Sequence, residues 1–287
     1  MLFMNERYGK RHITVLLMAV MVPWLLCGCS LSGGGNDAAY VDEFSGKNIG
    51  VMLSWDSDYA LTPRKDLNLV RYDAMPDMVM ALKHDRLDAM ALDELTAKSV
   101  EYMIQGIKAV KPGYGRFGYV AAFNPGAEDL CKDYNDFLKE YVESDEYADT
   151  QRRIAEFDGV DFEEAIIEPV GTGKIVRLAY LMEGYPSVYM DPETECMAGY
   201  DFEPLVRWAN DRNYRLEMTG TTYNDMMMGV SRGRYDVAVG YVNELYEDDF
   251  STFGIAHSDP INHLTNYFMI KTGESMSADS EFFDSYE

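Results

Sequence analysis

Two stretches of the chain carry the same pattern of apolar and polar positions. Residues 77–91 align without a gap with residues 225–239. Each stretch predicts a short amphipathic helix, a polar turn and then an apolar strand. The identical positions are Asp77/Asp225, Met78/Met226, Met80/Met228, Arg86/Arg234 and Asp88/Asp236. The chain therefore contains an internal repeat.

Further strands are predicted upstream of each copy. In the first copy they cover residues 47–53 and 67–72, and in the second copy residues 174–180 and 214–219. A helix is clear over residues 200–210, whereas the matching stretch of the first copy is short and holds Pro63, so a helix is doubtful there. Strands that alternate with helices build a parallel sheet with covering helices, and the pattern predicts an α/β fold in each half.

The N-terminal residues predict an export signal. A basic start is followed by an apolar stretch over residues 13–26, which is too short for a comfortable transmembrane helix and fits the core of a signal peptide. It ends in Leu26-Cys27-Gly28-Cys29, which looks like a bacterial lipobox with Cys29 as the lipidated residue. We expect residues 1–28 to be a lipoprotein signal peptide and residues 29–45, rich in Gly and Ser at their start, to be a flexible tether. The alternative is an uncleaved anchor helix, and both readings place the bulk of the chain on the extracytoplasmic side of a cell membrane.

Composition excludes several classes of protein. The 287 residues include 49 acidic and 25 basic side chains, for a formal charge of −24, and such a surface repels nucleic acid. The cysteines and histidines show no spacing typical of a zinc site, so we expect no metal and no cofactor. An exported location permits a disulfide between Cys131 and Cys196, and the sequence leaves that pairing open.

A set of short motifs resembles a known family. In order and spacing, the second copy resembles the extracellular solute-binding proteins of family 3, the receptors of ABC importers for amino acids and similar polar solutes. The first copy resembles the other lobe of that family, and the likeness covers roughly residues 41–271. The segments that carry it are residues 183–191, 199–205, 233–237 and 257–261 in the second copy, and residues 46–51, 87–93 and 115–123 in the first.

The resemblance implies a periplasmic-binding-protein type II clamshell, an α/β fold with two Rossmann-like lobes joined by a two-strand hinge. The lobe that usually comes second stands first here, which implies a circular permutation with a joining segment over residues 158–173. The alternative is one slice of a tandem array with lobes exchanged between copies. The implied parts are lobe II at 46–112, the hinge strand and closing helix of lobe I at 113–165, the main part of lobe I at 166–268, and the return hinge and C-terminal tail at 269–287.

The resemblance also implies site residues in lobe II. Ser54 and Ser57 match positions whose hydroxyls and amides bind a ligand's acidic group. Asp56 and Asp58 would oppose an anion there unless they cap the following helix. Asp93 matches the acid that holds a ligand's amino group, and its alternative role is the N-cap of a helix that starts near Glu94.

In lobe I, Tyr185 matches the family's aromatic platform and Tyr241 follows the third strand. Trp55, from lobe II, is a further candidate wall that could equally be core. Relatives carry a carboxylate-clamping arginine near residue 244, where this chain has Glu244, so binding of a simple α-amino acid is in doubt. Acids and tyrosines around a cleft suit a cationic or amine solute. The alternative is that Glu244 is solvated surface.

We therefore expect a membrane-tethered, monomeric receptor that passes a small polar solute, amine or amino-acid-like, to an ABC transporter permease. An extracytoplasmic sensor or orphan binding module is the alternative. A third class is a dehydratase-type enzyme on the same fold, for which Asp93, Glu183 and Glu244 are the candidate acids. We expect no catalytic residues and no enzymatic activity.

Overall fold

The computed structural model describes residues 42–182, 184–191 and 194–272. The expected signal peptide, Cys29, most of the tether and the C-terminal tail beyond residue 272 lie outside the described residues. None of the helices described combines the length and the apolar character that a membrane span requires.

Lobe II is built on a sheet with the strand order β2-β1-β3-β13-β4. Strand β1 (Asn48–Met52) runs parallel to β2 (Asn68–Tyr72) and to β3 (Ala89–Asp93), and β4 covers Ile107–Ala109. All five residues of β3 are buried, as expected of a central strand of a parallel sheet. The helices of this lobe are α2 (Asp56–Leu61), α3 (Met75–Lys83) and α4 (Glu94–Met103).

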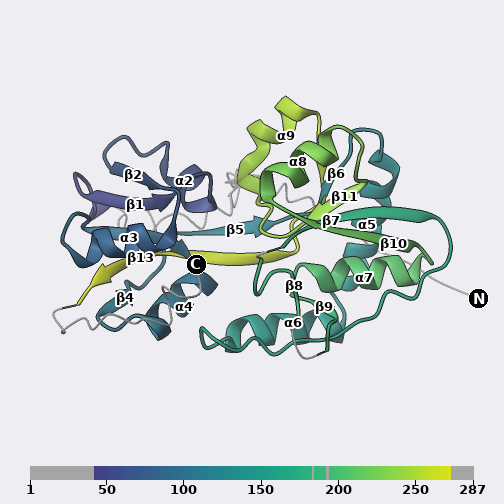
Figure 1. Ribbon diagram of the computed structural model, residues 1–287, viewed down its shortest axis with the longest axis horizontal. Helices are drawn as coiled ribbons and strands as arrows, with labels where there is room; N and C mark the ends of the chain where they lie inside the picture. The colour runs from purple at the N-terminus through teal and green to yellow at the C-terminus, as the bar shows by residue number, and fades with distance from the viewer. Residues whose placement is uncertain (1–41, 183, 192–193, 273–287) are drawn as a thin grey trace, which may run out of the picture. The chain divides into compact units, whose positions relative to one another are not determined.

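Lobe I is built on a second sheet, with the order β10-β7-β11-β6-β12 (Figure 1). Strand β7 runs parallel to both β10 and β11, whereas β6 is antiparallel to β11 and β12. The strands are β6 (Ala122–Phe123), β7 (Ile175–Leu181), β10 (Arg215–Thr221), β11 (Val237–Val239) and β12 (Ala256–His257), with a separate hairpin of β8 (Tyr189–Met190) and β9 (Met197–Ala198). The helices are α5 (Glu128–Tyr141), α6 (Asp145–Glu156), α7 (Phe202–Asp211), α8 (Tyr223–Ser231), α9 (Glu247–Phe253) and the 3₁₀ helix η1 (Glu244–Tyr246).

Two strands connect the sheets. Strand β5 (Gly115–Tyr119) leads from lobe II to β6, and β13 (Asn262–Lys271) leads back from β12 into lobe II. They pair antiparallel over residues 262–266 of β13, and the rest of β13 pairs with β3 and β4 (Figure 1). This arrangement confirms the predicted fold class of two α/β lobes with a two-strand hinge. The return strand begins at Asn262, before the expected boundary at residue 269, because its first half pairs with β5.

The two copies of the repeat take the same structure. The predicted helices are α3 and α8, and the predicted strands are β3 and β11. Met78 and Met226, identical in the alignment, are both fully buried. Helix α2 does form, and it ends at Leu61 ahead of Pro63, whose ring cannot continue a helix.

Helix α6, which follows the predicted closing helix α5 along the chain, was not predicted from the sequence. Ser144 is its N-cap, and its side chain accepts a hydrogen bond from the backbone N–H of Tyr147. The chain from Phe157 to Lys174 then has no helix or strand and includes the predicted joining segment.

Cys131 and Cys196 are both free thiols. The Sγ atom of Cys131 donates to the carbonyl of His257, and that of Cys196 donates to the carbonyl of Thr194. The pairing that the sequence left open is therefore not formed in this structure.

Candidate functional site

Two acidic side chains are buried at the carboxyl ends of the lobe II strands. Asp56 lies at the start of α2, just after β1, and is 5% exposed. Asp93 is the last residue of β3 and is 2% exposed. Within the described part of the chain, neither carboxyl is paired with a lysine, arginine or histidine. Two acids that lie close together without a cation are costly to ionise.

The pKa of Asp56 reflects this setting. Burial raises it from 3.8 to about 7, and the nearby charge of Asp93 adds to the rise. Hydrogen bonding opposes that effect: the backbone N–H of Ser57 donates to Oδ1 of Asp56 at 2.7 Å, the hydroxyl of Tyr119 donates to Oδ2 at 3.1 Å, and the side chain of Asn266 also lowers the pKa. Burial also raises the pKa of Asp93.

Asp93 is the N-cap of α4. Its Oδ1 atom accepts from the backbone N–H groups of Leu95 at 3.0 Å and Thr96 at 3.1 Å. The capping alternative is thus confirmed for one carboxylate oxygen. Ligand contact through the same carboxylate stays a prediction.

A buried amide lies beside these acids. Asn266 of β13 is the register partner of Asp93, and its side chain is fully buried. Its Nδ2 atom donates to Oγ of Ser57 at 3.4 Å, whereas its Oδ1 has no hydrogen-bond partner. The hydroxyl of Tyr114 is likewise buried without a partner. Unpartnered polar atoms in a protein interior are rare, and such atoms deserve an explanation.

The turn that carries Ser54 and Trp55 is held by a different acid. Ser54 has a positive φ of 62°, and its backbone N–H donates to Oδ2 of Asp58. Asp58 also forms an ion pair with Arg71 at 2.8 Å. Asp58 therefore stabilises the loop. Trp55 is 38% exposed, so it is not core.

Lobe I contributes aromatic and polar groups. The hydroxyl of Tyr241 donates to the carbonyl of Tyr185, and the ring of Tyr241 lies edge-on to that of Tyr119, with centroids 6.1 Å apart. Asp201 is buried, and it accepts from Oγ of Ser187 at 2.7 Å and from Nδ2 of Asn262 at 3.0 Å. Burial raises the pKa of Asp201 to about 6.

Glu244 takes a place that the sequence did not indicate. Its Oε1 atom accepts from the backbone N–H of Gly118 at 2.7 Å, so it ties η1 to the crossing strand β5. A Cβ at Gly118 would lie 3.0 Å from that same oxygen. The carboxylate of Glu244 serves the hinge in this structure.

The structure thus brings Ser57 and Asp93 of the predicted set together beside Asn266, and Tyr241 contacts the ring of Tyr119. Tyr119 and Asn266 were not among the predicted site residues, and Asp56 was expected either to oppose an anion or to cap the following helix. The available signal for Asn266 was its place, together with Asn262, on the buried alternate positions of the strand at residues 262–271. A separate hollow of about 320 Å³ beside the hinge includes none of the predicted residues; it is lined by Lys111, Pro112, Gly113, Gly115, Arg116, Thr265 and Tyr267. No cluster of metal-ligating side chains occurs among the described residues.

No protein-family model and no curated protein matches the sequence. Among solved structures, the chain is similar to the ligand-binding component of an ABC-type import system from Staphylococcus aureus, with 15% identity, a TM-score of 0.41 and coverage of 78% of this chain and 65% of that one. A phosphate-binding protein of a phosphate ABC transporter from Streptococcus pneumoniae matches with 10% identity, a TM-score of 0.40 and coverage of 84% and 95%. An ancestral amino-acid-binding protein, a precursor of cyclohexadienyl dehydratase, matches with 10% identity, a TM-score of 0.39 and coverage of 87% and 89%. The chain spans about 65% of the length of the Staphylococcus aureus protein, and likeness at this level does not extend to ligand or activity.

Proposed function

We propose that this protein binds a small cationic or amine solute, including an amino-acid-like one, between its two lobes. The observation that carries the proposal is the buried pair Asp56 and Asp93, which has no cation among the described residues, next to the unpartnered Oδ1 of Asn266. All of these groups accept hydrogen bonds or attract positive charge. A protonated amine brings donors and a positive charge, which is what this site lacks.

The surrounding tyrosines fit the same ligand. Tyr119 donates to Asp56, and its ring meets that of Tyr241 edge-on; aromatic rings attract cations to their faces. A carboxylate-only anion would meet two buried acids, and its entry would be opposed by like charge. The site therefore favours an amine over an anion.

Delivery to a transporter is the wider proposal. Membership in the extracellular solute-binding proteins of family 3, with a circular permutation, is proposed on the motifs alone. The chain starts in lobe II, crosses to lobe I through β5 and returns through β13, which completes the lobe II sheet. The Leu26-Cys27-Gly28-Cys29 motif supports a lipid anchor at Cys29 and an extracytoplasmic location. A monomer that serves an ABC permease is the form we propose, and a sensor without a transporter is its alternative.

An enzyme on the same scaffold is a second candidate, and one observation favours it. The pKa of Asp56, raised to about 7, is suited to a general acid or base near neutral pH. Among the acids named from the sequence, Asp93 shares its buried site and Glu244 is bound to the hinge, while Glu183 lies outside the described residues. Turnover of a bound amine would favour this reading, and release of the ligand unchanged would favour a receptor.

The first experiment identifies the ligand. Mass spectrometry of small molecules that copurify with the full-length protein should find an amine, and calorimetric titration should rank a diamine and amino acids above succinate. Tight binding of succinate with no binding of amines would overturn the proposal.

Variants then test the acid pair. Asp93→Asn removes the charge but keeps a good N-cap for α4, so it should weaken amine binding about tenfold to a hundredfold with little loss of stability. Asp225→Asn, an exposed acid in the first turn of α8, is the matched control and should bind normally. Equal affinities for the two variants would contradict a role for Asp93 in binding.

A further inference from the structure

The end of α6 and the residues after it contact both lobes. On the lobe II side, the Nζ atom of Lys98 on α4 lies 3.1 Å from the carbonyl of Ala155 and 3.5 Å from that of Ile154. Gly159 packs against the same helix, since a Cβ there would lie 2.5 Å from the carbonyl oxygen of Lys98. The last carbonyls of a helix lack intrahelical partners, and a lysine ammonium is a favourable one.

On the lobe I side, the same segment is bound by Tyr185. Its hydroxyl donates to the carbonyl of Val160 at 2.6 Å and accepts from the backbone N–H of Phe162 at 2.7 Å. The hydroxyl of Tyr189 donates to Oε2 of Glu164 at 2.6 Å. Tyr185, predicted as a ligand platform, is thus held in place by the joining segment.

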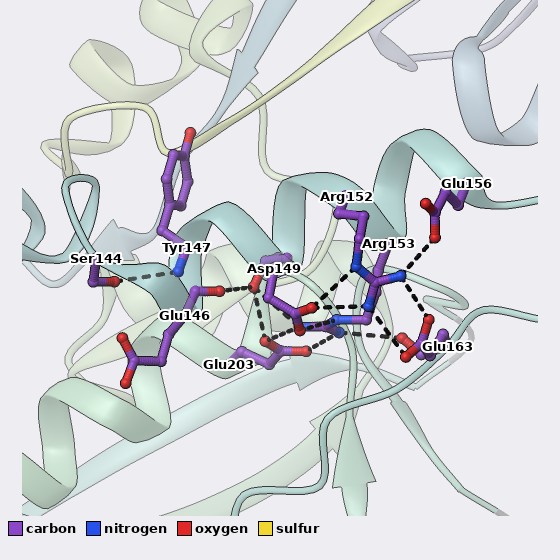
Figure 2. Close-up of polar contacts among 10 residues, drawn as sticks. Ser144, Glu146, Tyr147, Asp149, Arg152, Arg153, Glu156, Glu163 and Glu203 are labelled. Atoms are coloured by element: carbon purple, nitrogen blue, oxygen red, sulfur yellow. Dashed lines mark hydrogen bonds and ion pairs between the residues drawn. The ribbon is translucent and has the colours of Figure 1, made fainter.

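A buried ion pair fixes α6 to lobe I. Arg153 is 2% exposed, and its guanidinium makes two hydrogen bonds to the carboxylate of Glu203 on α7, at 2.6 and 2.7 Å (Figure 2). Arg153 also donates to the carbonyl of Glu163, beyond the end of the helix. By comparison, the polar contact to α4 consists of one lysine that is 27% exposed. The segment therefore belongs to lobe I, and its weaker attachment is the one to lobe II.

Apolar side chains fill the space between these attachments. One cluster combines Leu95 of α4 and Tyr119 of β5 with side chains of the segment and of lobe I. The other members are Ile154, Phe157, Phe162, Tyr200 and Leu264. Leu95 lies on the helix that Asp93 caps, and Tyr119 donates to Asp56, so this cluster borders the acid pair.

We propose that residues 154–162 form a clasp between the lobes, fixed to lobe I and released from α4 when the cleft over the acid pair opens. The lobes are also connected by the two crossing strands and by the ring contact of Tyr59 on α2 with Tyr246 of η1. The clasp adds a further connection, in which Lys98 and Leu95 of α4 meet the end of α6 and Phe162. This inference concerns how the lobes open, and it stands independently of which solute they bind.

Amide hydrogen exchange and small-angle X-ray scattering on the full-length protein test the clasp. Lys98→Ala should raise exchange about fivefold in residues 94–103 and 154–162, because one such hydrogen bond is worth roughly that factor in a local opening equilibrium. Residues 175–181 of β7 should be unchanged, and the radius of gyration should increase. Lys98→Arg keeps the cation and should restore both measurements.

Lys132→Ala is the matched control, because Lys132 also pairs with an acid four residues away on its own helix but lies on α5. Phe162→Leu keeps an apolar side chain and tests the other side of the clasp. It too should raise exchange in residues 94–103 and 154–162 and leave β7 unchanged. A rise in amide exchange confined to residues 154–162 would show that this segment only covers the surface, and it would overturn the clasp. A rise that includes β7, or an unchanged radius of gyration, would overturn it as well.

Discussion

The two halves of the repeat carry equivalent aspartates, Asp88 and Asp236, which make the same backbone contact in each lobe. In lobe II, Oδ2 of Asp88 accepts from the backbone N–H of Asn48 at 2.8 Å, and in lobe I, Oδ2 of Asp236 accepts from that of Arg177 at 2.8 Å. The backbone N–H of each aspartate donates in return to the carbonyl of the same partner residue. Each aspartate therefore ties the start of its third strand to the first strand of its sheet.

At the carboxyl ends of the strands the halves differ. Lobe II buries Asp56 and Asp93 without a cation among the described residues. Lobe I buries Glu203 in a bidentate pair with Arg153 (Figure 2), and another of its buried acids, Asp201, is a single carboxyl that is hydrogen-bonded to Ser187 and Asn262. A compensated buried acid serves the fold, while an uncompensated pair costs stability, and in the function proposed above it would receive the positive charge of the ligand. The duplicated frame was thus kept while the loops at its edge took different roles.

A large effect at fixed pH should come from breaking the lobe I ion pair. Glu203→Gln leaves the guanidinium of Arg153 buried without a counter-charge, which should cost about 3 kcal/mol in the free energy of unfolding. Urea unfolding measures this loss. Arg152→Ala is the control, because Arg152 forms its ion pairs on the exposed side of the same helix and should contribute little. Equal losses for both variants would contradict the contrast between the lobes.

The lobe II pair should make stability depend on pH in the opposite sense to ordinary paired carboxylates. Because the folded pKa of Asp56 lies above the unfolded value of 3.8, folding favours the protonated form. That stabilisation is complete below pH 3.8 and is lost as pH rises through about 7, by at most about 4 kcal/mol. Asp56→Asn should remove most of this dependence.

Thermal unfolding between pH 4 and pH 8 measures this difference. Asp225→Asn is the comparison variant, since an exposed acid shares the effect of the high net charge but not the burial. If the stability of Asp56→Asn changes with pH in parallel with that of Asp225→Asn, the ionisation of Asp56 costs the folded protein no free energy. Asp201, whose pKa is raised to about 6, should leave a smaller dependence of stability on pH in the Asp56→Asn variant.

Periodicity was enough to predict the sheets. The helix-strand pairs α3–β3 and α8–β11 come from the same local pattern, which occurs twice in the chain. The strand pair that crosses between the lobes was expected from the family resemblance, which assigned the hinge strand to residues 115–123. The cap of α4 could be read from an aspartate at the end of an apolar strand. These features depend on near neighbours in the chain.

The remaining features depend on distant parts of the chain. Arg153 and Glu203 are 50 positions apart, and Tyr119 and Asp56 are 63 apart, so no local pattern pairs them. Helix α6 did have a local signal, Ser144 followed by acidic residues, but it was obscured by the preceding helix. The role of Tyr185 could not be predicted because the segment that binds its hydroxyl has no regular structure.

The smallest expected effect is the most direct test of the duplicated frame. Asp88→Ala and Asp236→Ala each remove one strand-to-strand side-chain hydrogen bond, and each should cost about 1 kcal/mol in the free energy of unfolding. The loss at Asp236 should be somewhat larger, because its carboxylate also binds the guanidinium of Arg177 at 2.6 Å, whereas Lys47 lies 3.6 Å from Asp88. Urea unfolding of the two variants and of the double variant measures the loss of stability at each site and the loss when both are changed. The two sites lie in different lobes, so their effects should add. A double variant that falls well short of the sum would mean that the halves do not fold as equivalent, separately tied units.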